Sequence, residues 1–246
     1  MTFERSPGPP AEAGPAPVAG DLRVEPTPVQ LRLQILSTEH WSLLASRSLA
    51  WNESFSRAGM YLSTLSGAIV ALSLIGGVAG FHDAFFVVAL VVLPVVLFVG
   101  LGTWLRMGAT NYHDALNVIG MNRIRAAYLQ LAPELEPYFV MGVHDDAAGV
   151  GVTMAVPPGT SPIVHLIAGT PTLVMVLNGV VSGAIAALAL IRFTTAGDAV
   201  VLVASLAVAI VVYGLEVRSA RGKIRRAQEA LVPLFPTPPA DPRPGS

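Results

Sequence analysis

Histidine followed directly by aspartate occurs three times in the sequence, and these are residue types that bind metal ions. The histidines are His82, His113 and His144, and the last begins the run His144-Asp145-Asp146. Their spacing fits no known zinc pattern. The hydropathy pattern described below also places His82 on the opposite side of a membrane from the other two histidines. We therefore expect no metal site.

Other signatures of catalysis or cofactor binding are missing from the sequence. It contains no cysteine, which excludes disulfides, thiolate metal ligands and a cysteine nucleophile. A nucleophile elbow, a P-loop and a dinucleotide fingerprint are also missing. Its 15 Lys and Arg nearly balance its 16 Asp and Glu, which gives no reason to expect nucleic-acid binding. We expect a protein that is not an enzyme and needs no cofactor.

Polar side chains within apolar stretches are the remaining candidates for function. Ser63, Ser66 and Ser73 lie in one such stretch and Asn178 in another. Serines in a membrane helix indicate either helix packing or the lining of a pore. An unpaired amide in lipid costs several kcal/mol. Asn178 therefore needs a partner, which is either a carbonyl or serine of a neighbouring helix or an ion or substrate at mid-membrane.

Four long apolar segments must position these residues. The chain has 246 residues, 53% hydrophobic and only 13% charged, and its mean hydropathy is +0.62, whereas soluble domains are about 25% charged. About 20 apolar residues suffice to cross a bilayer as a helix. The pattern predicts an all-α membrane protein with four transmembrane helices in two hairpins, formed by residues 60–105 and 162–215.

The ends of the second hairpin are less sharply marked than those of the first. Ser161-Pro162 and Thr170-Pro171 are both typical helix starts, so the third segment begins at either place. The fourth segment, 199–215, ends before Glu216. With these bounds no acidic or basic side chain lies within the core of an apolar segment, which argues against proton-coupled transport.

The basic residues predict the orientation of the chain. With both hairpin turns outside, Arg192 is the only one of the 15 Lys and Arg on that side, which agrees strongly with the positive-inside rule. We therefore expect both termini to be cytoplasmic and the protein to lie in a bacterial inner membrane. Asp83 then occupies the outer turn of the first hairpin.

Cytoplasmic extensions are predicted between and beside the hairpins. Residues 27–59 are expected to form a helix, 106–161 a helix and a loop with a short strand near 150–156, and 216–232 a basic helix. The tails 1–26 and 233–246 are rich in proline and are expected to be disordered. The basic helix carries five cations that serve either as contacts for anionic lipid headgroups or only as a topological anchor: Arg218, Arg221, Lys223, Arg225 and Arg226.

Two stretches carry a resemblance to a known group. LASRSLAWNESFSRAGMYL leads into the first apolar segment, and GMNRIRAAYLQLAPELEPYF is followed by HDD. In these stretches the chain resembles the uncharacterised four-span integral membrane proteins of actinobacteria, which implies a cell-membrane protein and brings no catalytic residues. In layout alone, a basic-flanked helix running into the first of four spans resembles the Orai-type channels. That likeness implies an acid at the outer end of the first span, where only Asp83 is available.

Two functions follow from these patterns. The first is a homo-oligomeric ion channel or pore lined by the first span, indicated by Ser63, Ser66, Ser73 and the outer Asp83, and it requires self-association. The second is a non-catalytic membrane scaffold that recruits a cytoplasmic or membrane partner through its tails and the 106–161 segment.

Overall fold

The computed structural model describes residues 27–155 and 169–239, and these ranges are helical without any strand. The helices are α1 (Val29–Ala79), α2 (Asp83–Leu131), the 3-10 helix η1 (Pro133–Tyr138), α3 (Ala147–Thr153), α5 (Thr170–Phe193) and α6 (Asp198–Ala230). The all-α fold class is confirmed for this part of the chain. The predicted tail 1–26, residues 240–246 of the predicted tail 233–246 and the earlier start of the third segment at Pro162 lie outside the described residues. Residues 233–239 of the second tail are described and are not helical.

Four of these helices, α1, α2, α5 and α6, are long and apolar enough to cross a membrane. α1 and α2 have 51 and 49 residues, far more than the roughly 20 that a bilayer requires. Each continues without a break from the apolar segment into the neighbouring segment, where the sequence also predicts a helix. α1 ends at Gly80, whose φ of 68° costs glycine no steric strain, and α2 ends two residues before Pro133.

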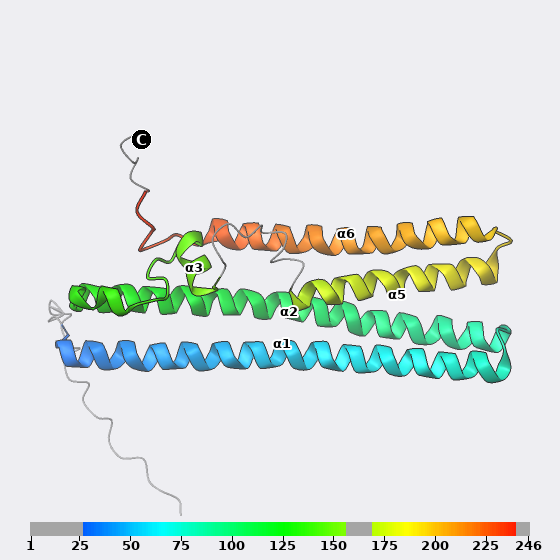
Figure 1. Cartoon of the computed structure of the whole chain (residues 1–246), viewed down its shortest axis with the longest axis horizontal. Coiled ribbons are helices and arrows are strands. Elements are labelled where there is room, and N and C mark those ends of the chain that lie inside the picture. The colour runs from blue at the N-terminus through cyan, green and yellow to red at the C-terminus, as the bar shows by residue number, and fades with distance from the viewer. Residues whose placement is uncertain (1–26, 156–168, 240–246) are drawn as a thin grey trace, which may run out of the picture.

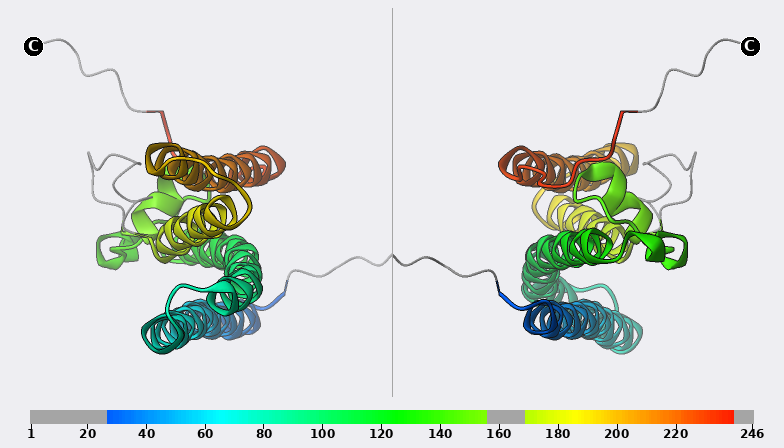
Figure 2. Two further views of the ribbon diagram at one scale, coloured as in Figure 1. Left: turned by 90° about the vertical axis from the view of Figure 1, so that its right-hand side faces the viewer. Right: turned by 90° about the vertical axis from the view of Figure 1, so that its left-hand side faces the viewer.

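The long helices form a row (Figures 1 and 2). α1 packs mainly on α2, α2 on α5 and α5 on α6, so that α1 and α6 lie at the two edges. The turn at residues 80–82 joins α1 to α2, and the turn at residues 194–197 joins α5 to α6. Both turns lie at the same end of the row (Figure 1), where an Arg192 nitrogen lies 3.4 Å from an Asp83 oxygen.

Apolar side chains pack together in the middle of the row, and ion pairs join α1 to α2 in the part farther from the two turns. The buried core includes Leu65 and Ala68 of α1, Leu93 and Val96 of α2 and Val181 of α5. Farther from the turns, Glu53 of α1 accepts hydrogen bonds from Arg57 and from Arg106 of α2, and Arg47 pairs with Asp114 at 3.0 Å. These polar contacts keep α1 and α2 together beyond the apolar core.

Glycines allow α5 and α6 to approach closely. A Cβ added at Gly179 would lie 2.9 Å from the carbonyl oxygen of Ala209, and one at Gly183 would lie 2.8 Å from that of Ser205. The Gly179-x-x-x-Gly183 pair therefore acts as a small-residue packing motif. This close contact sets which face of α6 points into the row.

One predicted element differs from the structure. The short strand expected near residues 150–156 is wrong for the described part of that range, because α3 covers Ala147–Thr153. The Asp146 side chain caps this helix by accepting a hydrogen bond from the Gly149 amide at 2.9 Å. A glycine-rich segment has no strong preference for helix or strand. The hydrogen bond from Gly149 to the Asp146 side chain therefore favours the helical turn.

Candidate functional site

A buried polar cluster lies where all four long helices come together. α1 supplies Tyr61, α5 supplies Asn178 and α6 supplies Glu216, and these three side chains meet beside Gly100 of α2. Asn178 Nδ2 donates a hydrogen bond to Glu216 Oε1 at 2.8 Å. Tyr61 and Asn178 are fully buried and Glu216 is 4% exposed. We call Tyr61, Gly100, Asn178 and Glu216 the polar cluster.

Gly100 makes room for the cluster. A Cβ added there would collide with Asn178 Oδ1 and would lie 2.7 Å from Cζ of the Tyr61 ring. Any side chain at this position would push Tyr61 away from Asn178, because carbon atoms pack at about 3.5–4.0 Å. The absence of a side chain on α2 is therefore what lets a residue of α1 reach α5.

The cluster is rich in oxygen atoms that have no partner. Four buried side-chain polar atoms lack a hydrogen bond in the part of the chain that the structure describes, and three of them are Tyr61 Oη, Asn178 Oδ1 and Glu216 Oε2. Within the same part, none of the ion pairs includes Glu216. A buried carboxylate is strongly disfavoured without a compensating positive charge or proton. The cluster thus presents an uncompensated acid and two further oxygens.

The level of the cluster along the row follows from helix geometry. Tyr61, Gly100, Asn178 and Glu216 lie about 22–27 Å along their helices from the turns, at a rise of 1.5 Å per residue. Slightly farther along, the Lys223 ammonium lies 5.3 Å from the centre of the Trp104 ring. Tryptophan and lysine are typical of the membrane–water interface. This pair indicates that the cluster lies just inside one edge of the apolar layer.

Comparison with known proteins adds no relative. No protein-family model, curated protein or solved structure matches the chain. The resemblances to four-span actinobacterial proteins and to the Orai layout therefore stay predictions.

The partner of Asn178 differs from the expected kinds. A carbonyl or serine of a neighbouring helix, or an ion or substrate, was predicted, whereas the amide donates to the carboxylate of Glu216. Serine contributes differently, because Ser182 Oγ donates to the backbone oxygen of Asn178 on the same helix at 2.7 Å. The predicted need for a partner holds, and the hydrogen bond links α5 to an acidic side chain of α6.

Glu216 is the buried acid of the candidate site that the sequence prediction missed. Ending the fourth segment at Leu215 placed this acid outside the apolar segment, whereas the structure buries its side chain between the helices. α6 continues without interruption to Ala230, and Glu216 is buried. A signal was available: Ala209, Tyr213 and Glu216 are spaced as one helix face, and Ala209 and Tyr213 contact Gly179 of α5.

The predicted pore residues of α1 point away from the row. Ser63, Ser66 and Ser73 are all exposed, and Ser73 donates to the backbone oxygen of Ile69. Asp83 lies at the turn with 84% of its side chain exposed, beside Arg192. None of these four residues belongs to the polar cluster, so of the five pore or packing candidates only Asn178 lies in it.

The predicted lipid contacts share one exposed stretch of α6. Arg218, Arg221, Lys223, Arg225 and Arg226 are all exposed. Lys223 lies over Trp104, and an Arg225 nitrogen lies 3.5 Å from a Glu229 oxygen. The row of four helices leaves this side of α6 uncovered.

A second polar group lies at the other end of α2, where the His144-Asp145-Asp146 run holds the C-terminal segment. Asp145 accepts hydrogen bonds from the amides of Leu234 and Phe235, each at 2.8 Å, and from Arg123 Nε at 2.7 Å. Asp146 accepts from the amide and the hydroxyl of Thr237, each at 2.8 Å. The run, first considered as a metal site, thus binds backbone amides of residues 234–237.

These hydrogen bonds make retention of the C-terminal segment dependent on pH. Burial disfavours the ionised form of Asp145, but the two amides and Arg123 outweigh it, so its pKa lies below the ordinary value. The pKa of Asp146 is lowered by the Gly149 amide and by Thr237, against a smaller effect of burial. Lowered pKa values mean that this stability is present above the unfolded value of about 4 and is lost as pH falls through the folded values.

We therefore expect residues 234–237 to stay bound at pH 5–7 and to detach as the pH falls through about 4 toward 3. A spin label on a Pro239→Cys variant, in a chain without other cysteines, should change from restricted to mobile over that interval. In an Asp145→Asn background the label should be mobile already at pH 7, because each hydrogen bond to a charged acceptor is worth about 2 kcal/mol. A label that is equally restricted at pH 7 and pH 3 would contradict this.

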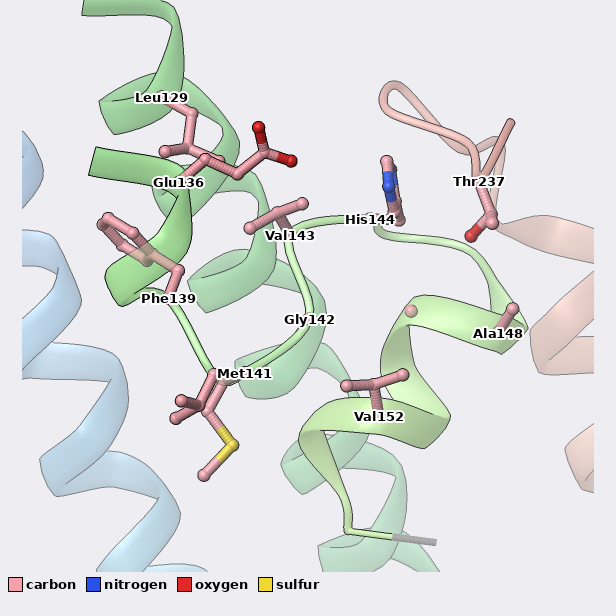
Figure 3. A pocket seen from close by; sticks show the side chains of 12 residues that line it. Leu129, Glu136, Phe139, Met141, Gly142, Val143, His144, Ala148, Val152 and Thr237 are labelled. Carbon is pink, nitrogen blue, oxygen red and sulfur yellow. The ribbon is translucent and has the colours of Figure 1, made fainter. Parts of the chain in front are cut away.

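A cavity of about 290 Å³ adjoins the bound segment (Figure 3). Apolar side chains of α3 and of the loop between η1 and α3 line most of it, among them Phe139, Val143 and Val152. His144, Glu136 and Thr237 supply its polar groups. Tyr138 and Val140 nearby are 79% and 84% exposed, so this end of the chain presents apolar surface.

Proposed function

We propose that the protein moves cations across the bacterial cell membrane and that Glu216 is the negative charge that a cation meets inside the helix row. The observation that supports this most directly is the burial of this carboxylate among four apolar helices without a basic partner in residues 27–155 and 169–239. Ionisable residues inside membrane helices are costly, and they typically mark ion or proton pathways. The proposal includes no catalysis.

Ion flux into liposomes tests this proposal. We expect the purified protein to admit potassium or sodium faster than empty vesicles and to exclude chloride. Glu216→Gln keeps the size of the side chain and removes its charge, so it should reduce the flux about tenfold or more, which corresponds to about 1.4 kcal/mol in the barrier. Glu229→Gln, an exposed acid on the same helix, is the matched control and should conduct normally. Equal flux in both variants would refute the proposal.

We propose a topology in which both hairpin turns face outward and both termini are cytoplasmic. The distribution of basic residues supports this orientation. The polar cluster then lies near the cytoplasmic edge of the hydrocarbon layer, and the exposed basic residues of α6 lie beside anionic lipid headgroups, each contributing about 1 kcal/mol. A phosphatase fused after Ser246 should be inactive and a fluorescent protein bright. The opposite pattern would reverse the topology.

Self-association through α1 is a second part of the proposal, separate from the path past Glu216, because Ser63, Ser66 and Ser73 face away from the row and line a conduit only between several copies of the chain. One exposed stripe of α1 supports it, because mainly small residues recur along it at an alternating spacing of four and three positions through Gly59, Ser63, Ser66, Val70, Ser73 and Gly77. This is the spacing of a helix–helix seam, and small residues there allow close approach in lipid.

Cysteine cross-linking tests self-association, since the chain has no cysteine of its own. Ser63→Cys should form a disulfide-linked dimer in native membranes under mild oxidation. Thr64→Cys is the matched control, because it is also exposed but points about 100° away around the helix, so it should stay largely monomeric. Equal cross-linking at both positions would argue against a defined α1 seam.

A scaffold role is the second candidate, and the cavity beside the bound C-terminal segment favours it (Figure 3). Exposed Tyr138 and Val140 flank this surface, and apolar patches of this kind are typical of protein interaction sites. A pull-down with the full-length protein, repeated with Tyr138→Ser/Val140→Ser, tests the role. A partner that binds both forms equally, or no partner at all, would count against it.

A further inference from the structure

The three unpartnered oxygens of the polar cluster lie on three different helices. Tyr61 Oη comes from α1, Asn178 Oδ1 from α5 and Glu216 Oε2 from α6, and each is fully screened from solvent. Asn178 Nδ2 donates a hydrogen bond to Glu216 Oε1 at 2.8 Å. The Oδ1 atom of the same amide has no hydrogen-bond partner. The hydrogen bond therefore sets both side chains so that each retains one free oxygen.

We propose that these three oxygens coordinate one monovalent alkali-metal cation between α1, α5 and α6. This inference rests on the proposed cation permeation and specifies the ion and the ligands of the same site. Hard cations prefer carboxylate and carbonyl oxygens as ligands. Gly100 lets Tyr61 reach the other two residues, because a Cβ there would lie 2.7 Å from Cζ of the Tyr61 ring and would collide with Asn178 Oδ1.

Charge favours a monovalent ion. Glu216 is the only acidic residue of the cluster, and in the described part of the chain no ion pair contains it. One monovalent cation neutralises the carboxylate, whereas a divalent cation would leave a net positive charge in an apolar surrounding, which is costly. Tyr61 and Asn178 are neutral ligands, so they add oxygen atoms without adding charge.

Charge distinguishes a cation from a water molecule, and the experiment described below distinguishes a cation from a proton. A proton on Glu216 would give one new donor beside the Tyr61 hydroxyl, which is itself a donor, so protonation would also pair these oxygens. A water molecule can hydrogen-bond to several of the oxygens, but it leaves the carboxylate charge uncompensated. A cation attracts all three oxygens at once and neutralises the charge, so it satisfies both requirements.

Thermal unfolding of the full-length protein in lipid nanodiscs at constant ionic strength tests the site. With sodium or potassium chloride well above its dissociation constant, the Tm should be about 5 °C or more higher than with N-methyl-D-glucamine chloride. Glu216→Gln and the milder Tyr61→Phe should reduce or abolish the difference, and Glu229→Gln should keep it. Tyr61→Phe removes only a hydroxyl, so it keeps the test valid if Glu216→Gln fails to fold.

Equilibrium binding of radioactive sodium and rubidium gives an independent readout, expected at about one ion per protomer and about tenfold weaker in Glu216→Gln. Equal Tm values in alkali-metal chloride and in N-methyl-D-glucamine chloride would overturn the site. A Tm that changes with pH but not with the alkali ion would indicate a proton instead, and a larger rise in Tm with calcium would contradict a monovalent site. Alkali binding without flux would support the site and refute the proposed transport. Flux that depends on Glu216 without alkali binding would do the reverse.

Discussion

Asn178→Leu is expected to destabilise the protein by about 3 kcal/mol, which is several times the average interhelical hydrogen bond in a membrane of about 0.6 kcal/mol. The reason is that the substitution removes the donor to a buried carboxylate, and a charged group left without its partner bears the full cost of desolvation. Thermal or denaturant unfolding in a fixed detergent and salt measures the effect.

A double variant separates the pair from simple packing loss. Asn178→Leu/Glu216→Leu removes both polar groups, and replacing a buried polar pair by apolar side chains is often close to neutral. We therefore expect the double variant to be more stable than Asn178→Leu alone, with a coupling of about 1–3 kcal/mol. Ser182→Ala is the control, because its hydroxyl bonds only to the backbone oxygen of its own helix. Additive losses would show that Asn178 and Glu216 do not depend on each other.

Gly100→Ala is expected to cost about 3 kcal/mol, at the upper end of the range for overpacking a buried site. The new methyl group would collide with Asn178 Oδ1 and lie 2.7 Å from Cζ of Tyr61. Both of these neighbours are fully buried, so neither has space to move. Unfolding measurements should show the loss, and the sodium-dependent rise in Tm should disappear with it.

Gly102→Ala is the matched control for this substitution. It lies two residues farther along the same helix, it is exposed, and a Cβ there meets nothing within 4 Å. Alanine is favoured over glycine in a helix by up to about 1 kcal/mol, so Gly102→Ala should be neutral or slightly stabilising. If the two variants unfolded alike, the close approach of Tyr61, Gly100 and Asn178 would be refuted.

The helices of this protein could be predicted because helix formation depends on interactions between residues that are close in the sequence. Helix hydrogen bonds join residues four apart, and in lipid a segment must satisfy its own backbone. Long apolar runs and the turns at residues 80–82 and 194–197 are therefore readable from hydropathy alone. The expectation of four apolar helices holds, and α1, α2 and α6 each run without a break from the apolar segment into the more polar segment beside it, where the sequence also predicts a helix.

The candidate site could be predicted only in part. Asn178 was recognisable because an amide in an apolar segment needs a partner, but the partner lies 38 residues away on another helix. Glu216 sits where hydropathy ends, and a change in hydropathy does not tell whether a side chain faces lipid, water or protein. Likewise, nothing local indicates that Asp145 and Asp146 hold amides about 90 residues farther along.

By itself the sequence determined the all-α class, the four apolar helices and the need of Asn178 for a partner, because composition and helical hydrogen bonding act over a few residues. Only the tertiary structure decided that Tyr61, Asn178 and Glu216 meet beside Gly100. That meeting depends on the rotation and register of packed helices, which follow from close contacts such as Gly179 against Ala209. Packing of this kind depends on the shapes of two surfaces together, and a single segment contains only one of them.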